Sequence, residues 1–281
     1  MKRVVVTGIG MINALGLDKD SSFKAICDGK TGVGKVTSFD ASRLPVQIAA
    51  EVKGFDPLSV VEDGKEVKKM DRFIQLGLKA AAEAMEDAKF DSFDGDEFGV
   101  SSASGIGGLP NIEKNAIVCS TRGPRRISPF FIPSALVNML GGMVSIAHGL
   151  KGPNLSSVTA CAASTHAICE GAKSIMIGEA KKMLVVGAES AICELGIGGF
   201  AAMKALSERN DDPSTASRPF DKGRNGFVMG EGAAALVLEE YEEAKERGAK
   251  IYAEIIGFGE SGDAFHITSP TRSEEHTSEL Q

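Results

Sequence analysis

The sequence predicts an α/β fold in which helices cover both faces of a sheet. Two observations carry this prediction. Short apolar strand patterns alternate with helix patterns along the chain, and the strand pattern at residues 183–187 is apolar throughout. A strand that is apolar on both faces is typical of a sheet buried between helices. The composition agrees, because 43% hydrophobic and 25% charged residues are ordinary values for a globular protein.

The first half of the chain begins with a strand. Residues 4–8 are β-branched, apolar and ended by glycine, which indicates a short buried strand. Residues 20–22 can cap a helix that stops at Gly29. A long helix follows at 68–89, where apolar side chains form one stripe. The other elements expected in this half are a strand at 46–52, a strand at 98–104 and a buried helix at 133–150.

The second half continues the alternation of strands and helices. A strand at 155–159 leads directly into a helix at 162–178, so residues 160–161 form a strand-to-helix junction. The remaining elements expected are strands at 183–187, 233–238 and 251–257 and a helix at 240–247. No flexible linker or short-period repeat interrupts this pattern.

Charge and composition exclude several classes of protein. The chain has 31 basic and 38 acidic residues, a net charge of −7, and no block of Lys and Arg, so we expect no nucleic-acid partner. No apolar run reaches about 18 residues, and glycines at positions 8 and 10 come too soon for a signal-peptide core, so we expect no membrane association. Five irregularly spaced cysteines indicate reduced thiols in a cytoplasm.

The sequence contains two partial matches to cofactor or metal-binding motifs, and both are incomplete. Residues 8–13 follow the first strand as a dinucleotide fingerprint would, but the third glycine and the later acidic residue are missing. Cys161, His166 and Cys169 lie at offsets that put them on different faces of one helix, so they do not form a metal site. We therefore expect no cofactor and no metal. The glycines at 105–108 indicate a close approach of the backbone to a ligand or another strand.

Cys161 is the leading candidate for chemistry. It occupies the strand-to-helix junction, where the dipole of the following helix favours a thiolate, the nucleophilic form of the side chain. Small neighbours leave the sulfur accessible, and nearby amides can hold a developing oxyanion. On spacing alone, a buried structural cysteine is an equal alternative.

Several stretches of the chain together resemble one family, the β-ketoacyl-acyl carrier protein synthases of the type II elongating class. These stretches are residues 3–8, 69–75, 104–108, 127–133, 159–161, 217–221, 226–232 and 263–270. The resemblance implies a thiolase-like fold with αβαβα layers and two similar halves, working as a homodimer. Residues 1–250 would form the first half, and residues 251–271 would open the second.

The same resemblance implies an activity, 3-oxoacyl-acyl carrier protein synthesis in fatty-acid biosynthesis. Cys161 matches the family nucleophile, which takes an acyl group from acyl carrier protein. Malonyl-carrier protein is then decarboxylated, and its carbanion attacks the thioester. The two histidines and the lysine that assist this step belong to the second half and would follow Thr271. His148, His166 and His266 match other positions of the family.

Other site residues are also implied by the resemblance. The substrate-binding residues expected are Ile106, Phe131, Phe200, His266 and Thr268, with Ile106 lining the acyl pocket and the two phenylalanines lying near the pocket or the dimer face. The residues expected to bind the acidic carrier protein are Lys65, Lys69 and Lys204. A solvated helix face is the equal alternative for each lysine.

Three alternatives stay open. A non-catalytic chain-length partner subunit would lack the cysteine, which is present here. A polyketide ketosynthase usually continues after the nucleophile with a serine-rich run, whereas Ala162, Ala163 and Ser164 follow here. A coenzyme A-dependent enzyme would not need the carrier-facing lysines.

The last ten residues differ from the rest of the chain. Residues 272–281 are polar and without period, and one choice of codons for them spells a common sequencing-adapter oligonucleotide. We expect them not to be native and the natural polypeptide to stop near Thr271 in an incomplete reading frame. Without this segment the net charge changes from −7 to −5, since it holds one arginine and three glutamates.

Overall fold

The computed structural model describes residues 1–262 and 264–265. Strands are β1 (Val4–Asn13), β2 (Gly34–Lys35), β3 (Ile48–Ala49), β4 (Phe98–Ala103), β5 (Asn154–Ser157), β6 (Lys182–Glu189), β7 (Gly232–Glu240) and β8 (Ala253–Ile255). Helices are α1 (Lys19–Cys27), α2 (Gly64–Val67), α3 (Arg72–Ala88), α4 (Leu109–Arg122), α5 (Phe131–Ala135), α6 (Asn138–His148), α7 (Ala163–Ile177), α8 (Glu194–Ala202) and α9 (Tyr241–Glu246).

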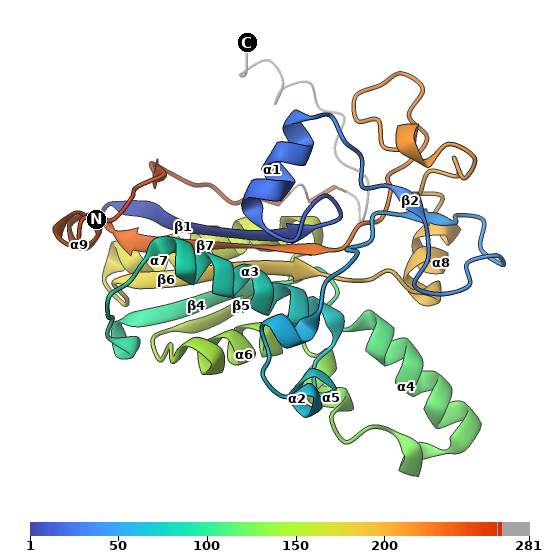
Figure 1. The fold of residues 1–281 in the computed structure, drawn as a ribbon, viewed down its shortest axis with the longest axis horizontal. Helices are drawn as coiled ribbons and strands as arrows, with labels where there is room; N and C mark the ends of the chain where they lie inside the picture. The colour runs from blue at the N-terminus through green and yellow to red at the C-terminus, as the bar shows by residue number, and fades with distance from the viewer. Residues whose placement is uncertain (263, 266–281) are drawn as a thin grey trace.

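The centre of the fold is a six-stranded sheet with the order β5-β4-β6-β7-β1-β8 (Figure 1). β4 is parallel to both β5 and β6, whereas β7 is antiparallel to β6 and β1, and β8 is antiparallel to β1. The sheet is therefore mixed. β2 and β3 form a separate antiparallel pair.

Helices cover both faces of this sheet, as predicted. α3 and α6 pack on one face and α7 on the other. Successive residues of β6 alternate between the two cores: Leu184 and Val186 join the core with α3, and Met183 and Val185 join the core with α7. All four are buried, which explains why this strand is apolar throughout.

The glycines of the first strand serve helix packing. β1 runs to Asn13, well beyond the predicted end, and Gly8 and Gly10 lie inside it against α3. A Cβ atom on Gly10 would lie 2.0 Å from the carbonyl oxygen of Ala80, and one on Gly8 would lie 2.3 Å from that of Ala84. The near match to a dinucleotide fingerprint thus comes from close contact between strand and helix.

The single helix predicted at 133–150 is wrong: two helices, α5 and α6, occupy this stretch. The Ala135 carbonyl oxygen accepts a hydrogen bond from the Gly108 amide at 3.1 Å, which takes an acceptor that a continuous helix would use. The stretch is also less buried than expected, since Ile146 is 76% exposed.

Smaller differences concern caps and short elements. Asp18, which lies two residues before the predicted capping segment at 20–22, caps α1 by accepting from the Ser21 amide at 2.7 Å. Of the strand predicted at 46–52, only Ile48–Ala49 forms a strand, and Ala50 adds an isolated parallel bridge to Gly230. α4 and α8 were not predicted. α4 buries only Asn115 and so has no strong apolar stripe. It extends away from the sheet as an arm (Figure 1).

No helix among residues 1–262 and 264–265 is long and apolar enough to cross a membrane. Within the same residues, no group of His, Cys, Asp and Glu side chains is arranged to hold a metal ion.

Candidate active site

Cys161 lies exposed on the wall of a cavity of about 630 Å³. It belongs to a short 3-10 turn, Ala160–Ala162, that links β5 to the N-terminus of α7. The cavity is lined mostly by apolar side chains and glycine backbone. The prediction that Cys161 occupies a strand-to-helix junction is therefore confirmed, and the structural alternative of a buried cysteine is wrong.

The backbone just before Cys161 is held in an unusual conformation. Ala160 has φ of 50°, in the left-handed region that non-glycine residues adopt at a cost of roughly 1 kcal/mol. Two hydrogen bonds support this turn. The Ala162 amide donates to the Thr159 carbonyl at 3.1 Å, and Thr159 Oγ1 lies 2.7 Å from Nδ1 of His166. Together they fix the position from which the sulfur of Cys161 faces the cavity.

A second part of the cavity wall is the turn that follows β4. Ile106 lies in this turn and is 38% exposed. The carboxylate of Glu189, at the end of β6, accepts hydrogen bonds from the amides of Gly105 and Ile106, each at 2.8 Å. The turn is thus attached to the central sheet through a side chain.

An aromatic pair completes the apolar lining. The rings of Phe200 and Phe227 meet edge to face with centroids 5.3 Å apart, and both residues line the cavity. Phe200 comes from α8, and Phe227 precedes β7. Apolar walls around a nucleophile suit a hydrocarbon chain, because burying each methylene is worth about 0.8 kcal/mol.

The structure brings three of the expected site residues into one cavity: Cys161, Ile106 and Phe200. Phe131 lies elsewhere, at the start of α5, and does not line this cavity in the described part of the chain. His266 and Thr268 lie outside the described residues.

The three expected lysines are distributed over two places. Lys65 is exposed on α2, and Lys69 follows it, with its Nζ 5.3 Å from the ring centroid of Phe130 and paired with Glu66. Lys204 lies after α8, exposed. Lys65 and Lys69 thus lie near the base of the α4 arm, where the chain returns from the arm into α5 (Figure 1).

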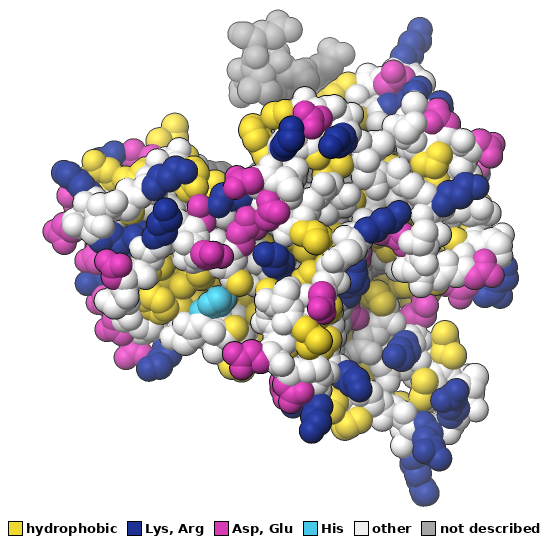
Figure 2. Space-filling model, viewed as in Figure 1, with side chains coloured by type: hydrophobic (Ala, Val, Ile, Leu, Met, Phe, Trp, Pro, Cys, Tyr) yellow, Lys and Arg dark blue, Asp and Glu magenta, His cyan; other side chains and the backbone are white. Residues whose placement is uncertain are grey.

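Further cations lie on this arm, and sequence reasoning did not single them out. Arg125 and Arg126 are exposed after α4 and form no ion pair within the described residues. Figure 2 shows Lys and Arg side chains gathered at the end of the arm. The signal available in the sequence was the dipeptide Arg-Arg, which is too short to stand out as a basic block.

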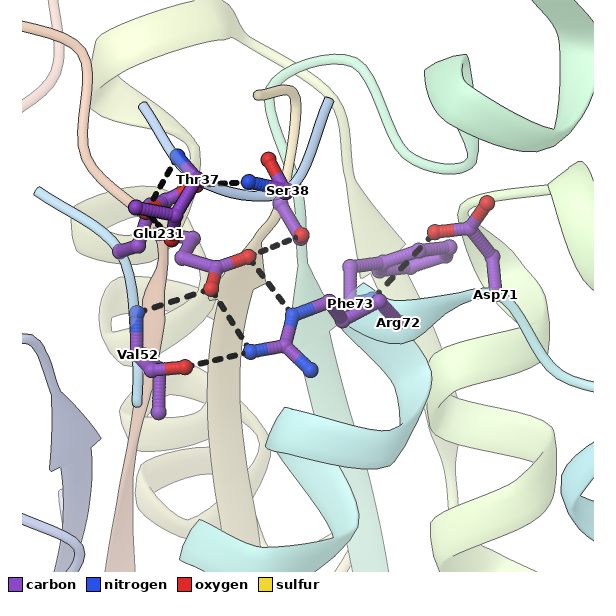
Figure 3. Close-up of polar contacts among 9 residues, drawn as sticks. Thr37, Ser38, Val52, Asp71, Arg72, Phe73 and Glu231 are labelled. Carbon is purple, nitrogen blue, oxygen red and sulfur yellow. Dashed lines mark hydrogen bonds and ion pairs between the residues drawn. The ribbon is translucent and has the colours of Figure 1, made fainter. Parts of the chain in front are cut away.

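A partly buried ion-pair network supports the cavity wall from behind (Figure 3). Arg72 binds both carboxylate oxygens of Glu231 at 2.8 Å and the Val52 carbonyl at 2.7 Å. Ser190 Oγ donates to Glu231 at 2.6 Å. Since Ser190 and Glu231 directly adjoin residues that line the Cys161 cavity, the network holds two segments of that wall in place.

Next to this network lies a second cavity, of about 720 Å³, which Asp71 lines together with Arg72 and Glu231. Asp71 caps α3 and accepts from the Asn111 amide of α4 at 3.1 Å. Burial raises the pKa of the Asp71 carboxyl to about 6, although hydrogen bonds from backbone amides oppose the rise.

The structure is a mixed sheet between helices, with an exposed cysteine at a helix N-terminus on the wall of an apolar cavity, and this is an arrangement that suits a nucleophilic thiol. The chain belongs to the β-ketoacyl synthase family: the model of the beta-ketoacyl synthase N-terminal domain matches residues 1–244.

Named relatives agree with this assignment. The chain is 53% identical over 271 residues to 3-oxoacyl-[acyl-carrier-protein] synthase 2 of Coxiella burnetii and 48% identical over 272 residues to that of Vibrio harveyi. Each alignment covers 96% of this chain but 65% of the relative. The chain thus spans about two thirds of the length of these proteins.

Solved structures show the same fold. A β-ketoacyl synthase from Burkholderia phymatum matches with a TM-score of 0.88 at 33% identity, over 96% of this chain and 67% of the other. A type II polyketide ketosynthase in complex with its acyl-carrier protein matches with a TM-score of 0.81 at 31% identity, over 95% and 64% of the two chains. The thiolase-like fold expected from the resemblance is confirmed.

Proposed function

We propose that this chain supplies the acyl-accepting part of a 3-oxoacyl-acyl carrier protein synthase of type II fatty-acid biosynthesis. The observation that carries the proposal is the exposed Cys161 at the N-terminus of α7, on the wall of an apolar cavity. A nucleophile placed there can take an acyl group whose hydrocarbon chain is buried beside it.

The proposed first step is thioester exchange. The Cys161 thiolate attacks the acyl thioester of the carrier protein, a tetrahedral oxyanion forms, and the carrier thiolate leaves and takes up a proton. The fixed turn at 159–162 holds the sulfur for this attack. Amides at the start of α7 lack intrahelical partners and are the available donors for the oxyanion.

The proposed second step is decarboxylative condensation. Malonyl-carrier protein loses carbon dioxide, its carbanion attacks the Cys161 thioester, and the 3-ketoacyl product leaves as the thiolate is restored. Among the described residues, neither histidine nor lysine lines the cavity. We therefore assign stabilisation of the carbanion to a second half, which residues 251–271 would open after the first half at 1–250.

The proposed partners are acyl carrier protein and a second copy of the chain. Lys65 and Lys69, with the arm cations beside them, form a cationic surface that suits an acidic carrier, and we keep Lys204 as a further contact. The ketosynthase captured with its acyl-carrier protein supports this type of partner. For Phe131 we keep a role at the dimer face, and for His266 and Thr268 a role in substrate binding.

The fatty-acid function is favoured over the polyketide alternative by sequence identity. Relatives named 3-oxoacyl-[acyl-carrier-protein] synthase 2 are 46–53% identical to this chain over 96% of its length or more, whereas the type II polyketide ketosynthase is 31% identical. Five free cysteines suit a reducing compartment, and we propose a cytoplasmic location.

The test separates the two steps. The 281-residue chain is incubated with acyl-carrier protein, and mass spectrometry locates the acyl group. We expect it on Cys161, with transfer lost in Cys161→Ala and retained in the matched control Cys27→Ala, which removes another exposed thiol. Acyl transfer that persists in Cys161→Ala, or acylation of another cysteine, would contradict the proposal.

Two additions to this assay test the rest of the proposal. Malonyl-carrier protein should yield little 3-ketoacyl product from the 281-residue chain, because each missing oxyanion or carbanion donor typically costs ~10²–10³ in rate. Turnover like that of an intact synthase would refute the assignment to a second half. Acyl-coenzyme A should be a poorer donor than acyl-carrier protein, and the reverse order would favour a coenzyme A-dependent enzyme.

A further inference from the structure

The turn that carries Ile106 is held by side chains. Glu189 accepts both the Gly105 and Ile106 amides at 2.8 Å, and Ser104 Oγ donates to the same carboxylate at 3.2 Å. The Gly107 amide donates in turn to Ser104 Oγ at 3.0 Å. Three successive backbone amides of the turn, those of residues 105–107, therefore donate hydrogen bonds to the side chains of Glu189 and Ser104.

The Glu189 side chain is not engaged in an ion pair within residues 1–262 and 264–265. Glu189 is the last residue of β6, a strand whose backbone is fixed by β4 on one side and β7 on the other. A carboxylate on such a rigid base can hold a turn that lacks regular backbone pairing.

A side chain at position 105 would press on the Glu189 carboxylate. A Cβ atom there would lie 2.9 Å from the Glu189 carboxylate and 3.5 Å from the carbonyl oxygen of Ala160, the residue before Cys161. The turn is therefore packed between Glu189 and the segment that presents the nucleophile. Glu189, Ile106 and Cys161 all line the same cavity.

We propose that Glu189 is a positioning residue that sets the Ile106 wall of the Cys161 cavity and thereby controls how well a long hydrocarbon chain enters beside the thiol. This proposal rests on the proposed function for the nature of the chain. Without the carboxylate, the Gly105 and Ile106 amides lose their acceptor and must be hydrated. Water at this wall and a displaced Ile106 both disfavour a long apolar chain.

The test uses alkylation of Cys161, which needs no carrier protein and no thioester. Rates of modification by iodoacetamide and by N-dodecyl iodoacetamide are measured on the 281-residue chain by mass spectrometry of the Cys161 peptide. In Glu189→Ala we expect the long-chain rate to fall at least ~5-fold relative to the iodoacetamide rate. Glu189→Gln keeps an acceptor oxygen for the amides and should stay within about twofold of wild type.

Two further variants keep the result decisive. Glu189→Asp preserves the charge but withdraws the carboxylate by one methylene, so it should behave like Glu189→Ala even if the alanine variant folds poorly. Glu240→Ala removes a glutamate that accepts an amide at the cap of α9, away from the cavity, and should leave the ratio unchanged.

An unchanged ratio in Glu189→Asp and Glu189→Ala would overturn the proposal, as would a loss in Glu189→Gln equal to that in Glu189→Ala. Failure of the proposed function would be seen separately, as absence of acyl transfer from carrier protein while the alkylation ratio still depends on Glu189.

Discussion

The five cysteines differ sharply in solvent exposure because each has different surroundings. Cys161 and Cys27 are exposed, Cys119 is partly exposed, and Cys169 and Cys193 are buried. Burial raises the pKa of the Cys169 thiol and raises that of Cys193 to about 12. Near neutral pH these two remain thiols and so are poor nucleophiles.

Alkylation should therefore follow environment. We expect iodoacetamide at pH 8 to modify Cys161 first and the buried Cys169 and Cys193 much more slowly, with Cys193 slowest, since a thiol of pKa about 12 is ionised in only about one molecule in ten thousand. Time-resolved peptide mass spectrometry measures the order. Modification of Cys27 or Cys119 well before Cys161 would argue against a special environment at the helix N-terminus.

At the scale of elements, the joint between α3 and the α4 arm depends on one carboxyl. Asp71 caps α3 and accepts from the Asn111 amide of α4. Because burial raises its pKa to about 6, ionisation of this group opposes folding. The unfolded chain releases this proton near pH 4, while the folded chain keeps it until about pH 6. Stability from this site is therefore highest below pH 4 and falls as the pH rises to 6.

Asp71→Asn should remove this dependence. Asparagine keeps the cap without titrating, so we expect the unfolding free energy of wild type relative to Asp71→Asn to fall by up to about 3 kcal/mol between pH 4 and pH 6. Urea unfolding of both proteins at several pH values measures the difference.

Asp18→Asn is the matched control, at the cap of α1. The Ser21 amide lowers the pKa of the Asp18 carboxyl, so its contribution is lost as the pH falls, and the wild-type advantage should grow with pH. A difference for Asp71→Asn that is flat or has the same sign as that for Asp18→Asn would contradict the assignment.

At the scale of the whole molecule, one edge of the central sheet is open to solvent. β5 is the outer strand of the described sheet, and its residues 154–156 are exposed. Leu155 and Val158 expose apolar side chains at this edge, 37% and 56% of their surface. An edge strand, paired on one side only and carrying exposed apolar side chains, is a template for another strand, so this edge is where we expect a second copy to bind.

Charges at this edge should weaken self-association. We expect Leu155→Lys with Val158→Lys to raise the dimer dissociation constant at least ~10-fold, measured by analytical ultracentrifugation. Ile26→Lys is the control, because Ile26 is equally exposed, at 56%, but lies on α1. Equal weakening by the control, or a dimer unaffected by the β5 variant, would place the interface elsewhere.

The sequence by itself determined the main elements and the position of Cys161 at a strand-to-helix junction. The apolar run of β6, the stripe of α3 and the small residues around Cys161 each depend on local patterns of period or composition, which can be read without coordinates. The family resemblance then supplied the residues Ile106 and Phe200, which the structure brings beside Cys161.

Only the tertiary structure decided how these parts are held together. Glu189 is 83 residues from Ile106 in sequence, and Glu231 is 159 residues from Arg72, so no local pattern shows either contact. The break between α5 and α6 depends on an amide from another segment, and the glycines of β1 depend on the backbone of α3. These features come from hydrogen-bond acceptors and excluded volume between distant segments, which exist only after the chain has folded.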